Sequence, residues 1–371
     1  MAERARAARI HACGTAPVVG DVDPPATGPG VVLVEVLAAP ITPLDLLCAS
    51  GTSYFGTPAT PYVPGVQGVG RHAGRVVWFP TPAGMAPGDG SMASVVAVRE
   101  ADLVALPPDA DPVAVAAAGL SAVAAFAALT WRGRLRAGET VLVLGGGGVV
   151  GQAAIQFAKA AGAARVLAAA RSAAARDRAR DAGADVVIPL DFGGGPVAWG
   201  AGLPGPGTID AVAGGAPDGG VAWAPDPPRP DTIDAVVADG PVAEAEVLAD
   251  RFRAACPEGA DLVLDTLFGP PAAAAAQVLK PGGRLVNLGS SAAETAPFDS
   301  ATLRSKQLDV LGYTNVALSP DQRADAIRTV ADAVRAGRLT IAHETYPLAD
   351  AAEAWSRQAS GAAEGRVVLV P

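Results

Sequence analysis

Cysteine and histidine are both scarce in this chain, with three of each among 371 residues. Cys13, Cys48 and Cys256 lie too far apart in sequence for a CxxC pair, which excludes a zinc ribbon and a redox dithiol. A scattered, odd set of cysteines also forms no disulfide framework and is typical of a reducing compartment. We therefore expect a cytoplasmic protein that holds no metal.

Positively charged residues are also fewer than negatively charged ones. Lys and Arg number 28 against 37 Asp and Glu, so the formal net charge is −9. Because so acidic a chain lacks the basic surface that binds phosphate backbones, we expect no nucleic-acid partner. The first residues carry charge, but no apolar segment follows them, and we expect no secretory signal.

One segment without charge, Val113 to Trp131, is long enough to raise the question of a membrane. It is rich in alanine and is interrupted by Gly119 and Ser121. This composition is more typical of a close-packed buried helix than of a membrane span. We expect no membrane partner.

Residues 1 to about 110 predict short β-strands separated by turns. The clearest runs are Val31–Leu37, Arg75–Phe79 and Ser94–Val98, with Gly and Pro between them. No helical periodicity of any length is present in this part. The pattern predicts a small barrel-like or irregular β-domain.

From Pro112 onward the pattern changes to alternating strands and helices. Thr140–Leu144 is an unbroken apolar run, typical of a strand covered on both faces. Similar runs follow at 165–170, 185–189, 261–265, 284–288 and 308–312. This rhythm predicts an α/β domain with a doubly wound parallel sheet of the Rossmann type. A last run, Arg366–Val370, is suited to rejoin the sheet of the first domain.

The rhythm fails between about residues 192 and 241, where Gly, Pro, Ala and Asp dominate. A structureless loop of this length is uncommon inside a compact domain. It is either a lid or partner-binding insertion or a tolerated surface excursion. Thr208–Val212 is echoed by Thr232–Val236, which also allows an extra β-hairpin. The sequence leaves these alternatives open.

The strongest local motif is a glycine loop between the first strand of this domain and the next helix. Gly146, Gly148 and Gly151 have the GxGxxG spacing of a dinucleotide-binding site. The glycines allow a tight turn, a close approach of backbone to a pyrophosphate, and close packing of helix on strand. The helix is expected at Gln152 to Ala161, and its unpaired N-terminal N–H groups and its dipole favour phosphate next to the loop, which includes Val149 and Val150.

The end of the second strand of this domain selects the cofactor. An acidic residue there would bind the ribose 2′-hydroxyl of NAD, but the strand ends at Ala170 without a carboxylate. Arg171, Ser172 and Arg176 follow it. Guanidinium and hydroxyl groups suit a 2′-phosphate, so we predict NADP(H). The alternative is that Arg171 is only a solvated charge at the strand end.

Several short stretches, in this order and spacing, match a known family. They are Ala39–Asp45, Ser50–Thr52, Pro61–Gly70, Pro87–Asp89, Gln156–Lys159, Ala182–Asp185, Lys280–Val286 and Gly365–Leu369, together with the glycine loop. The chain resembles the medium-chain dehydrogenases/reductases over nearly its whole length, and in particular their zinc-free quinone oxidoreductase branch.

The resemblance implies a GroES-like first domain at residues 1–111 and a Rossmann NADP(H)-binding domain at 112–317. It also implies a return to the first domain at 318–371, with the active cleft between the two domains. A homodimer joined through the last Rossmann strand, Leu308 to Leu311, would be usual for the family.

The chain departs from the zinc-dependent members of this family. Where they carry a cysteine and a Gly-His-Glu, this chain has Thr42 and Gly65-Val66-Gln67. Their four-cysteine lobe is missing as well. We therefore expect no catalytic zinc.

Departures also affect the cleft of the quinone reductases. Their asparagine, tyrosine and arginine around the first cleft loop correspond here to Thr42, Leu47 and Ala49. The remaining polar candidates for catalysis are Thr42, Asp45 and Tyr54, and Asp45 is as well suited to a structural turn as to catalysis. The cleft thus lacks the usual polar residues of the quinone reductases, which argues against a simple quinone substrate.

The resemblance implies further contacts with the cofactor. Ser121 stands where the family has a threonine beside the nicotinamide, and Arg366 matches a basic residue near the adenine ribose phosphate. Residues after the fourth and fifth Rossmann strands would line the same edge of the sheet. These are Thr266, Asn287, Leu288 and Gly289.

Two functions from different classes remain. Reduction of a quinone or an α,β-unsaturated carbonyl compound by NADPH needs no metal, because hydrogen bonds can stabilise the delocalised charge. The alternative is a catalytically weak NADP(H)-binding sensor or scaffold, which the depleted lining and the long insertion would suit. Alcohol oxidation would require a Lewis acid or a general base, and we do not expect it.

Overall fold

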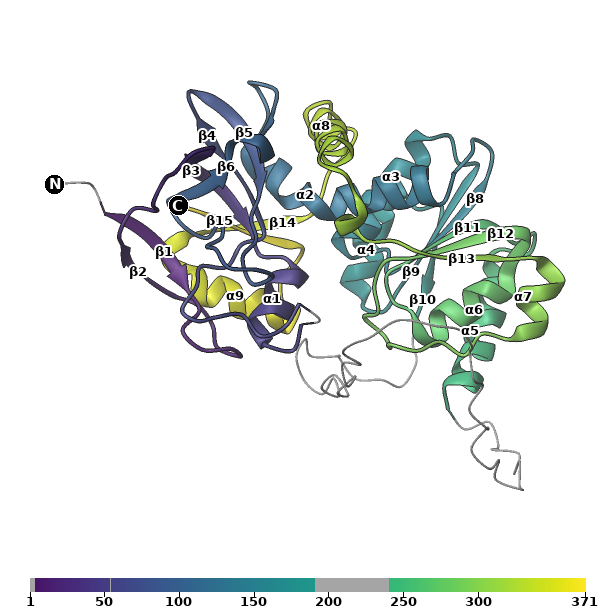
Figure 1. Ribbon diagram of the computed structural model, residues 1–371. Coiled ribbons are helices and arrows are strands. Elements are labelled where there is room, and N and C mark those ends of the chain that lie inside the picture. Colours follow the sequence, from purple (N-terminus) through teal and green to yellow (C-terminus); the bar gives the residue numbers. More distant parts are fainter. Residues whose placement is uncertain (1–3, 54, 191–239) are drawn as a thin grey trace, which may run out of the picture.

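The structure, a computed structural model, describes residues 4–53, 55–190 and 240–371. Figure 1 shows two lobes, each built around a sheet, with helices α2 (Pro112–Ala127) and α8 (Pro320–Arg335) between them. The expected Tyr54 and most of the insertion at 192–241 lie outside the described residues. The α/β architecture expected from the sequence is confirmed.

The first lobe is mainly antiparallel β-structure. Its larger sheet has the strand order β14-β15-β3-β4-β5-β7, with β6 paired to β3, and β1 pairs with β2 in a separate hairpin. The terminal strand β15 pairs antiparallel with β3, so the end of the chain lies in this lobe. The strands are β1 (Ala5–Arg9), β2 (Val18–Val22), β3 (Val31–Pro40), β4 (Gln67–His72), β5 (Arg75–Pro80), β6 (Val95–Arg99), β7 (Val104–Ala105), β14 (His343–Pro347) and β15 (Arg366–Val370).

A short helix in this lobe corrects the expectation of β-structure alone. Helix α1 (Pro43–Ser50) begins with a capping box, in which Thr42 Oγ1 accepts from the Asp45 N–H and the Asp45 carboxylate accepts from the Thr42 N–H. Pro43 stands at the first helical position, where its missing N–H costs nothing. At eight residues the helix is too short to give a periodic apolar pattern, so its caps were the only signal. A second helix, α9 (Ala351–Ser360), packs on β15.

The second lobe is the expected parallel sheet. Its strand order is β10-β9-β8-β11-β12-β13, and every pair of neighbours is parallel. The order reverses between β8 and β11, the point at which such sheets bind ligands. The strands are β8 (Thr140–Leu144), β9 (Arg165–Ala170), β10 (Val186–Pro189), β11 (Ala260–Asp265), β12 (Leu279–Asn287) and β13 (Asp309–Gly312). The helices are α3 (Val149–Ala160), α4 (Ala173–Asp181), α5 (Pro241–Ala255), α6 (Gly269–Val278) and α7 (Ser300–Lys306).

Helix α2 is the buried helix that the sequence predicted, but it is not continuous. Gly119 has φ 36° and ψ −138°, which breaks the helix in its middle. Among the described residues, Pro112–Arg132 is the one segment with the length and composition of a membrane span, and 67% of its most apolar window is buried in the fold. It packs against α3, α8, β3 and β4, so its apolar faces are covered by the protein.

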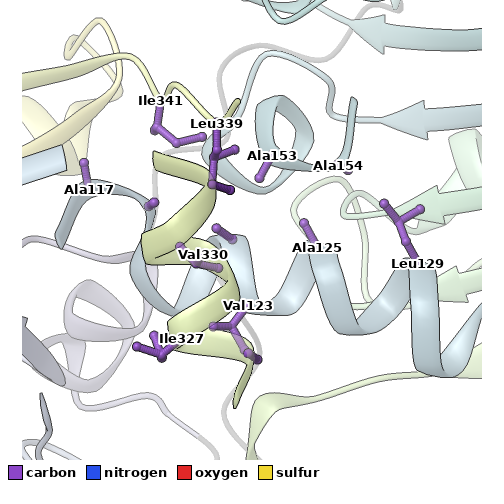
Figure 2. Close-up of a cluster of buried hydrophobic side chains, with 14 of the residues drawn as sticks. Ala117, Val123, Ala125, Leu129, Ala153, Ala154, Ile327, Val330, Leu339 and Ile341 are labelled. Carbon is purple, nitrogen blue, oxygen red and sulfur yellow. The ribbon is translucent and has the colours of Figure 1, made fainter. Parts of the chain in front are cut away.

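The core between the lobes consists of small and branched side chains. Figure 2 shows Ile327 and Val330 of α8 next to Val123 of α2, with none of the three exposed to solvent. Alanines of α2 and α3 permit the close approach of these helices. The labelled members are Ala117, Ala125, Ala153 and Ala154, with Leu129, Leu339 and Ile341.

Replacing Ile327 by alanine should lower the free energy of unfolding by about 2–4 kcal/mol, because a fully buried side chain leaves a cavity that neighbouring helices only partly fill. Urea unfolding followed by circular dichroism measures the change. Arg328→Ala is the control, since Arg328 is exposed and pairs with Asp325 one turn away; it should change stability by about 0.5 kcal/mol or less. Equal effects of the two variants would contradict the packing described.

Candidate functional site

The glycine loop lies between β8 and α3, at the carboxyl edge of the parallel sheet. The N–H groups of Gly145 and Gly146 donate to the Ala169 carbonyl at 2.9 and 3.0 Å, which fixes the turn against β9. A Cβ at Gly151 would overlap the Gly145 carbonyl oxygen, so α3 packs on the loop only because residue 151 is glycine. The sequence motif therefore has the close packing that its spacing predicts.

The outer side of this loop is open. A Cβ at Gly148 would meet only the Gly145 carbonyl oxygen, at 3.4 Å. Within the described residues no side chain caps the N-terminus of α3, where Val149 and Val150 begin the helix. Uncapped N–H groups and the positive end of a helix dipole at an open backbone ledge are suited to bind an anion.

The ends of β11 and β12 meet the same loop. Thr266 Oγ1 donates to the Leu144 carbonyl at 2.9 Å and lies where a Cβ of Gly145 would be. Asn287 Nδ2 donates to the Gly289 carbonyl at 2.7 Å. Thr266 thus lies against the glycine loop, and Asn287, Leu288 and Gly289 lie at the neighbouring strand end, where Gly289 approaches Thr266.

Asp265 organises these strand ends. Its carboxylate accepts from the N–H groups of Leu267 and Phe268 and from Asn287 Nδ2, each at 2.9 Å. Burial raises the pKa of Asp265, and these hydrogen bonds partly offset that rise. Because both carboxylate oxygens accept hydrogen bonds, Asp265 stabilises the turn and does not serve as a general base in the cleft.

At the end of β9, Arg171 and Ser172 follow Ala170 as expected. Arg171 is exposed, and Ser172 is the N-cap of α4, where its hydroxyl accepts from the Ala175 N–H at 3.1 Å. Arg176, one turn on, donates to the Arg171 carbonyl. Arg171 is therefore exposed at the end of β9, two residues beyond Ala169, whose carbonyl accepts from the glycine loop.

Arg178 also lies at the glycine loop, although the sequence did not predict it. Its Nε donates to the Gly147 carbonyl at 2.9 Å, and Gln152 Nε2 donates to the same oxygen at 3.1 Å. Burial lowers the pKa of Arg178, while Glu364 raises it. A half-buried guanidinium thus lies against the glycine loop. No motif spacing marks this position, because the contact depends on how α4 packs.

Thr42 and Asp45 lie on the first lobe with their polar atoms largely engaged. Asp45 Oδ2 accepts from the N–H and hydroxyl of Thr42 at 2.7 and 2.6 Å. Its Oδ1 accepts from the N–H groups of Gly65 and Val66 at 3.0 and 2.9 Å. Burial raises the pKa of Asp45, and the same hydrogen bonds oppose that rise. This geometry gives Asp45 the role of holding α1 to the loop at Val66.

Arg366 and Ser121 are in direct contact. Arg366 Nη2 donates to Ser121 Oγ at 2.9 Å, and Nη1 donates to the Ile41 carbonyl at 2.8 Å. The resemblance assigned Ser121 to the nicotinamide and Arg366 to the adenine ribose phosphate, which are opposite ends of a dinucleotide. Because the two side chains are in direct contact, they would meet the same part of a bound dinucleotide.

Two cavities lie in the first lobe. One of about 370 Å³ is lined by Arg9 and Asp21, and one of about 540 Å³ is lined by Tyr62 and Met85, both in the first lobe. Neither touches the glycine loop, so the anion site rests on backbone geometry. Among the described residues no group of three His, Cys, Asp or Glu side chains is arranged to hold a metal ion.

Comparisons with known proteins agree with this fold. Two family models described as zinc-binding dehydrogenase match residues 149–213 and 233–369. The quinone oxidoreductases of Rattus norvegicus and Homo sapiens are 34% and 31% identical over 172 and 166 residues. Each match covers 42% of this chain and 50% of the relative, so the chain spans about half the length of these curated relatives.

Solved structures match over the whole chain. A mycobacterial quinone oxidoreductase has a TM-score of 0.75 at 21% identity, covering 99% of this chain and 100% of its own. The quinone oxidoreductase of Thermus thermophilus, solved alone and with NADPH, has a TM-score of 0.69 at 25% identity, covering 99% and 100%. A probable oxidoreductase of Mycobacterium abscessus has a TM-score of 0.70 at 25% identity, covering 100% of each chain.

Replacing Asp45 by asparagine should lower the free energy of unfolding by about 2–4 kcal/mol, because an amide nitrogen would face N–H donors that now share a buried carboxylate. Thermal unfolding measures the change. Asp89→Asn makes the same chemical change at an exposed carboxylate that accepts from the Val63 N–H, and it should be nearly neutral. A stable Asp45→Asn protein would show that the carboxylate is not structural.

Proposed function

Because the chain belongs to the medium-chain dehydrogenase/reductase superfamily, we propose that it is a zinc-independent oxidoreductase that transfers hydride from NADPH to a quinone or an α,β-unsaturated carbonyl compound. The observation that carries this proposal is the open glycine loop at the uncapped N-terminus of α3. It lies at the reversal of strand order, with the Thr266 hydroxyl beside it.

The residues present fit a phosphorylated dinucleotide. The backbone from Gly148 to Val150 suits the pyrophosphate, since the space beside Gly148 is open and no described side chain caps this end of α3. Arg171 and the hydroxyl of Ser172 lie at the end of β9, where no carboxylate would repel a 2′-phosphate. The quinone oxidoreductase of Thermus thermophilus was solved with NADPH, which supports the same choice here.

The hydroxyl groups of the cleft differ in what they can donate. NADPH supplies the hydride when bound, and the protein must stabilise the charge that develops on the acceptor oxygen. Thr42 Oγ1 already donates to Asp45, so its proton is engaged. Ser121 Oγ accepts from Arg366, which leaves its own proton free. We assign Ser121 as the hydrogen-bond donor of the cleft and Thr42 and Asp45 as positioning residues.

Zinc independence rests on residue identity. Thr42 and Val66 stand where zinc-dependent relatives carry a cysteine and a histidine, and neither side chain offers a thiolate or an imidazole. The Val66 N–H is held by Asp45, which binds this segment to the start of α1. Asp45 thus fixes the positions of Thr42 and Val66, and neither of these two residues supplies a metal ligand.

We also propose a cytoplasmic homodimer. Strand β13 lies at the edge of the parallel sheet, and its Val310 is 43% exposed. An apolar side chain on an unpaired edge strand is suited to pair with a second copy. The three cysteines are all free, in keeping with a reducing compartment.

Purified protein should oxidise NADPH in the presence of at least one quinone or enone from a panel of both, followed by loss of nicotinamide absorbance. Dialysis against a chelator should leave the rate unchanged, since no step needs zinc. Tight NADPH binding without turnover on any acceptor would instead favour a sensor or scaffold of the same fold. A rate restored only by added zinc would contradict the metal-free site.

Replacing Arg171 by alanine should raise the Kd for NADPH by about 10- to 100-fold, because a charge-assisted contact to the 2′-phosphate is lost. The Kd for NADH, which has no such phosphate, should stay within about twofold. Fluorescence titration with each nucleotide measures both constants. Arg180→Ala is the control, since Arg180 pairs with Asp177 on the same helix. Equal losses for NADPH and NADH would contradict the phosphate role.

A further inference from the structure

Arg366 joins three segments that are remote in sequence. It lies on β15 with 3% of its surface exposed. Its guanidinium donates to the carbonyl of Ile41, just after β3, and to the hydroxyl of Ser121, just after the break in α2. A buried cation with two such partners on different elements is held in one orientation, because moving it would leave polar groups unpaired.

The hydrogen bond to Ser121 has a fixed direction. A guanidinium has five N–H donors and no acceptor, so Ser121 Oγ can only accept from it. Within the described chain this is the one hydrogen bond of the Ser121 side chain. A hydroxyl has a single proton. Because Ser121 Oγ accepts from Arg366, the Ser121 proton points away from Arg366 and can be donated to another group.

We propose that Arg366 is a positioning residue that fixes the Ser121 hydroxyl as a donor toward the nicotinamide and the acceptor. This inference rests on the proposed function, in which Ser121 lies at the nicotinamide. It assigns Arg366 to the redox end of the cleft and gives it no contact with the adenine ribose phosphate.

The charge of Arg366 persists in this setting. Burial lowers the pKa of Arg366 to about 10, and the nearby Asp45 carboxylate works against that decrease. The guanidinium therefore stays protonated at neutral pH and keeps its donors. Asp45 is itself fixed by Thr42, Gly65 and Val66, so the electrostatic partner of Arg366 does not move independently.

A double-mutant cycle with Ser121→Ala and Arg366→Met tests the inference. With NADPH and a 1,4-naphthoquinone, each single variant should lower kcat by roughly 10- to 100-fold, the effect of losing one oriented donor. The double variant should be no slower than either single variant, because Arg366 acts through Ser121. A purely structural Arg366 would instead lower kcat again in the Ser121→Ala background, and that result would overturn the inference.

Conservative variants separate orientation from folding. Ser121→Thr keeps a hydroxyl and should retain kcat within several-fold. Arg366→Lys keeps a group that can only donate, and it should retain more activity than Arg366→Met at comparable thermal stability. If Arg366→Met does not fold, the cycle is run with Arg366→Lys, and additive losses in kcat would again overturn the inference.

Nucleotide binding provides a readout that does not depend on turnover. Fluorescence titration of Arg366→Met should leave the ratio of the Kd values for NADPH and NADH unchanged. A selective loss of NADPH affinity would place Arg366 at the adenine phosphate and overturn the inference.

Failure of the proposed function would be recognised separately. A wild-type protein that turns over no acceptor would refute the reductase activity but leave the positioning role open to the same cycle. In that case the emission of bound NADPH should change equally in Ser121→Ala, Arg366→Met and the double variant. Additive changes in emission would contradict the positioning role.

Discussion

The break in helix α2 at Gly119 is the constraint on which the cleft depends. With φ 36°, this residue frees the Leu120 N–H from the helix, and Gln67 Oε1 of the first sheet accepts it at 2.9 Å. The same oxygen accepts from Trp78 Nε1 at 3.0 Å, and Asn315 Nδ2, beyond β13, donates to the Leu120 carbonyl at 2.9 Å. A Cβ at Gly119 would overlap the Gln67 amide, so the junction between the two sheets requires glycine there.

This junction and the glycine loop define the two ends of the proposed nucleotide site. The loop offers backbone N–H groups and a helix dipole, which suit phosphate, whereas the break in α2 presents the hydroxyl of Ser121. Most polar groups between them have internal partners, as Asp45 and Asp265 illustrate. Among the described residues, carboxylates held in this way suit a reaction in which the cofactor performs the chemistry and the protein positions it.

Much of the parallel domain could be predicted from the sequence, because strands buried on both faces leave gapless apolar runs and the glycine spacing follows from close packing. Helix α1 could have been predicted from the capping box at Thr42 and Asp45 and from Pro43, although its eight residues show no periodicity. The contacts of Arg178 and Arg366 could not, since each depends on how a helix or strand packs against a distant segment. A resemblance assigns roles by position along the chain, and it carries no information on the contact of Arg366 with Ser121.

The central claim is that NADPH extends from the glycine loop to the break in α2. A crystal structure of the protein with NADPH tests it most directly. The account predicts the pyrophosphate at the N–H groups of Val149 and Val150, the 2′-phosphate beside Arg171, and the nicotinamide ring beside Ser121. A nucleotide bound in either cavity of the first lobe, or with its 2′-phosphate against Arg366, would contradict the account.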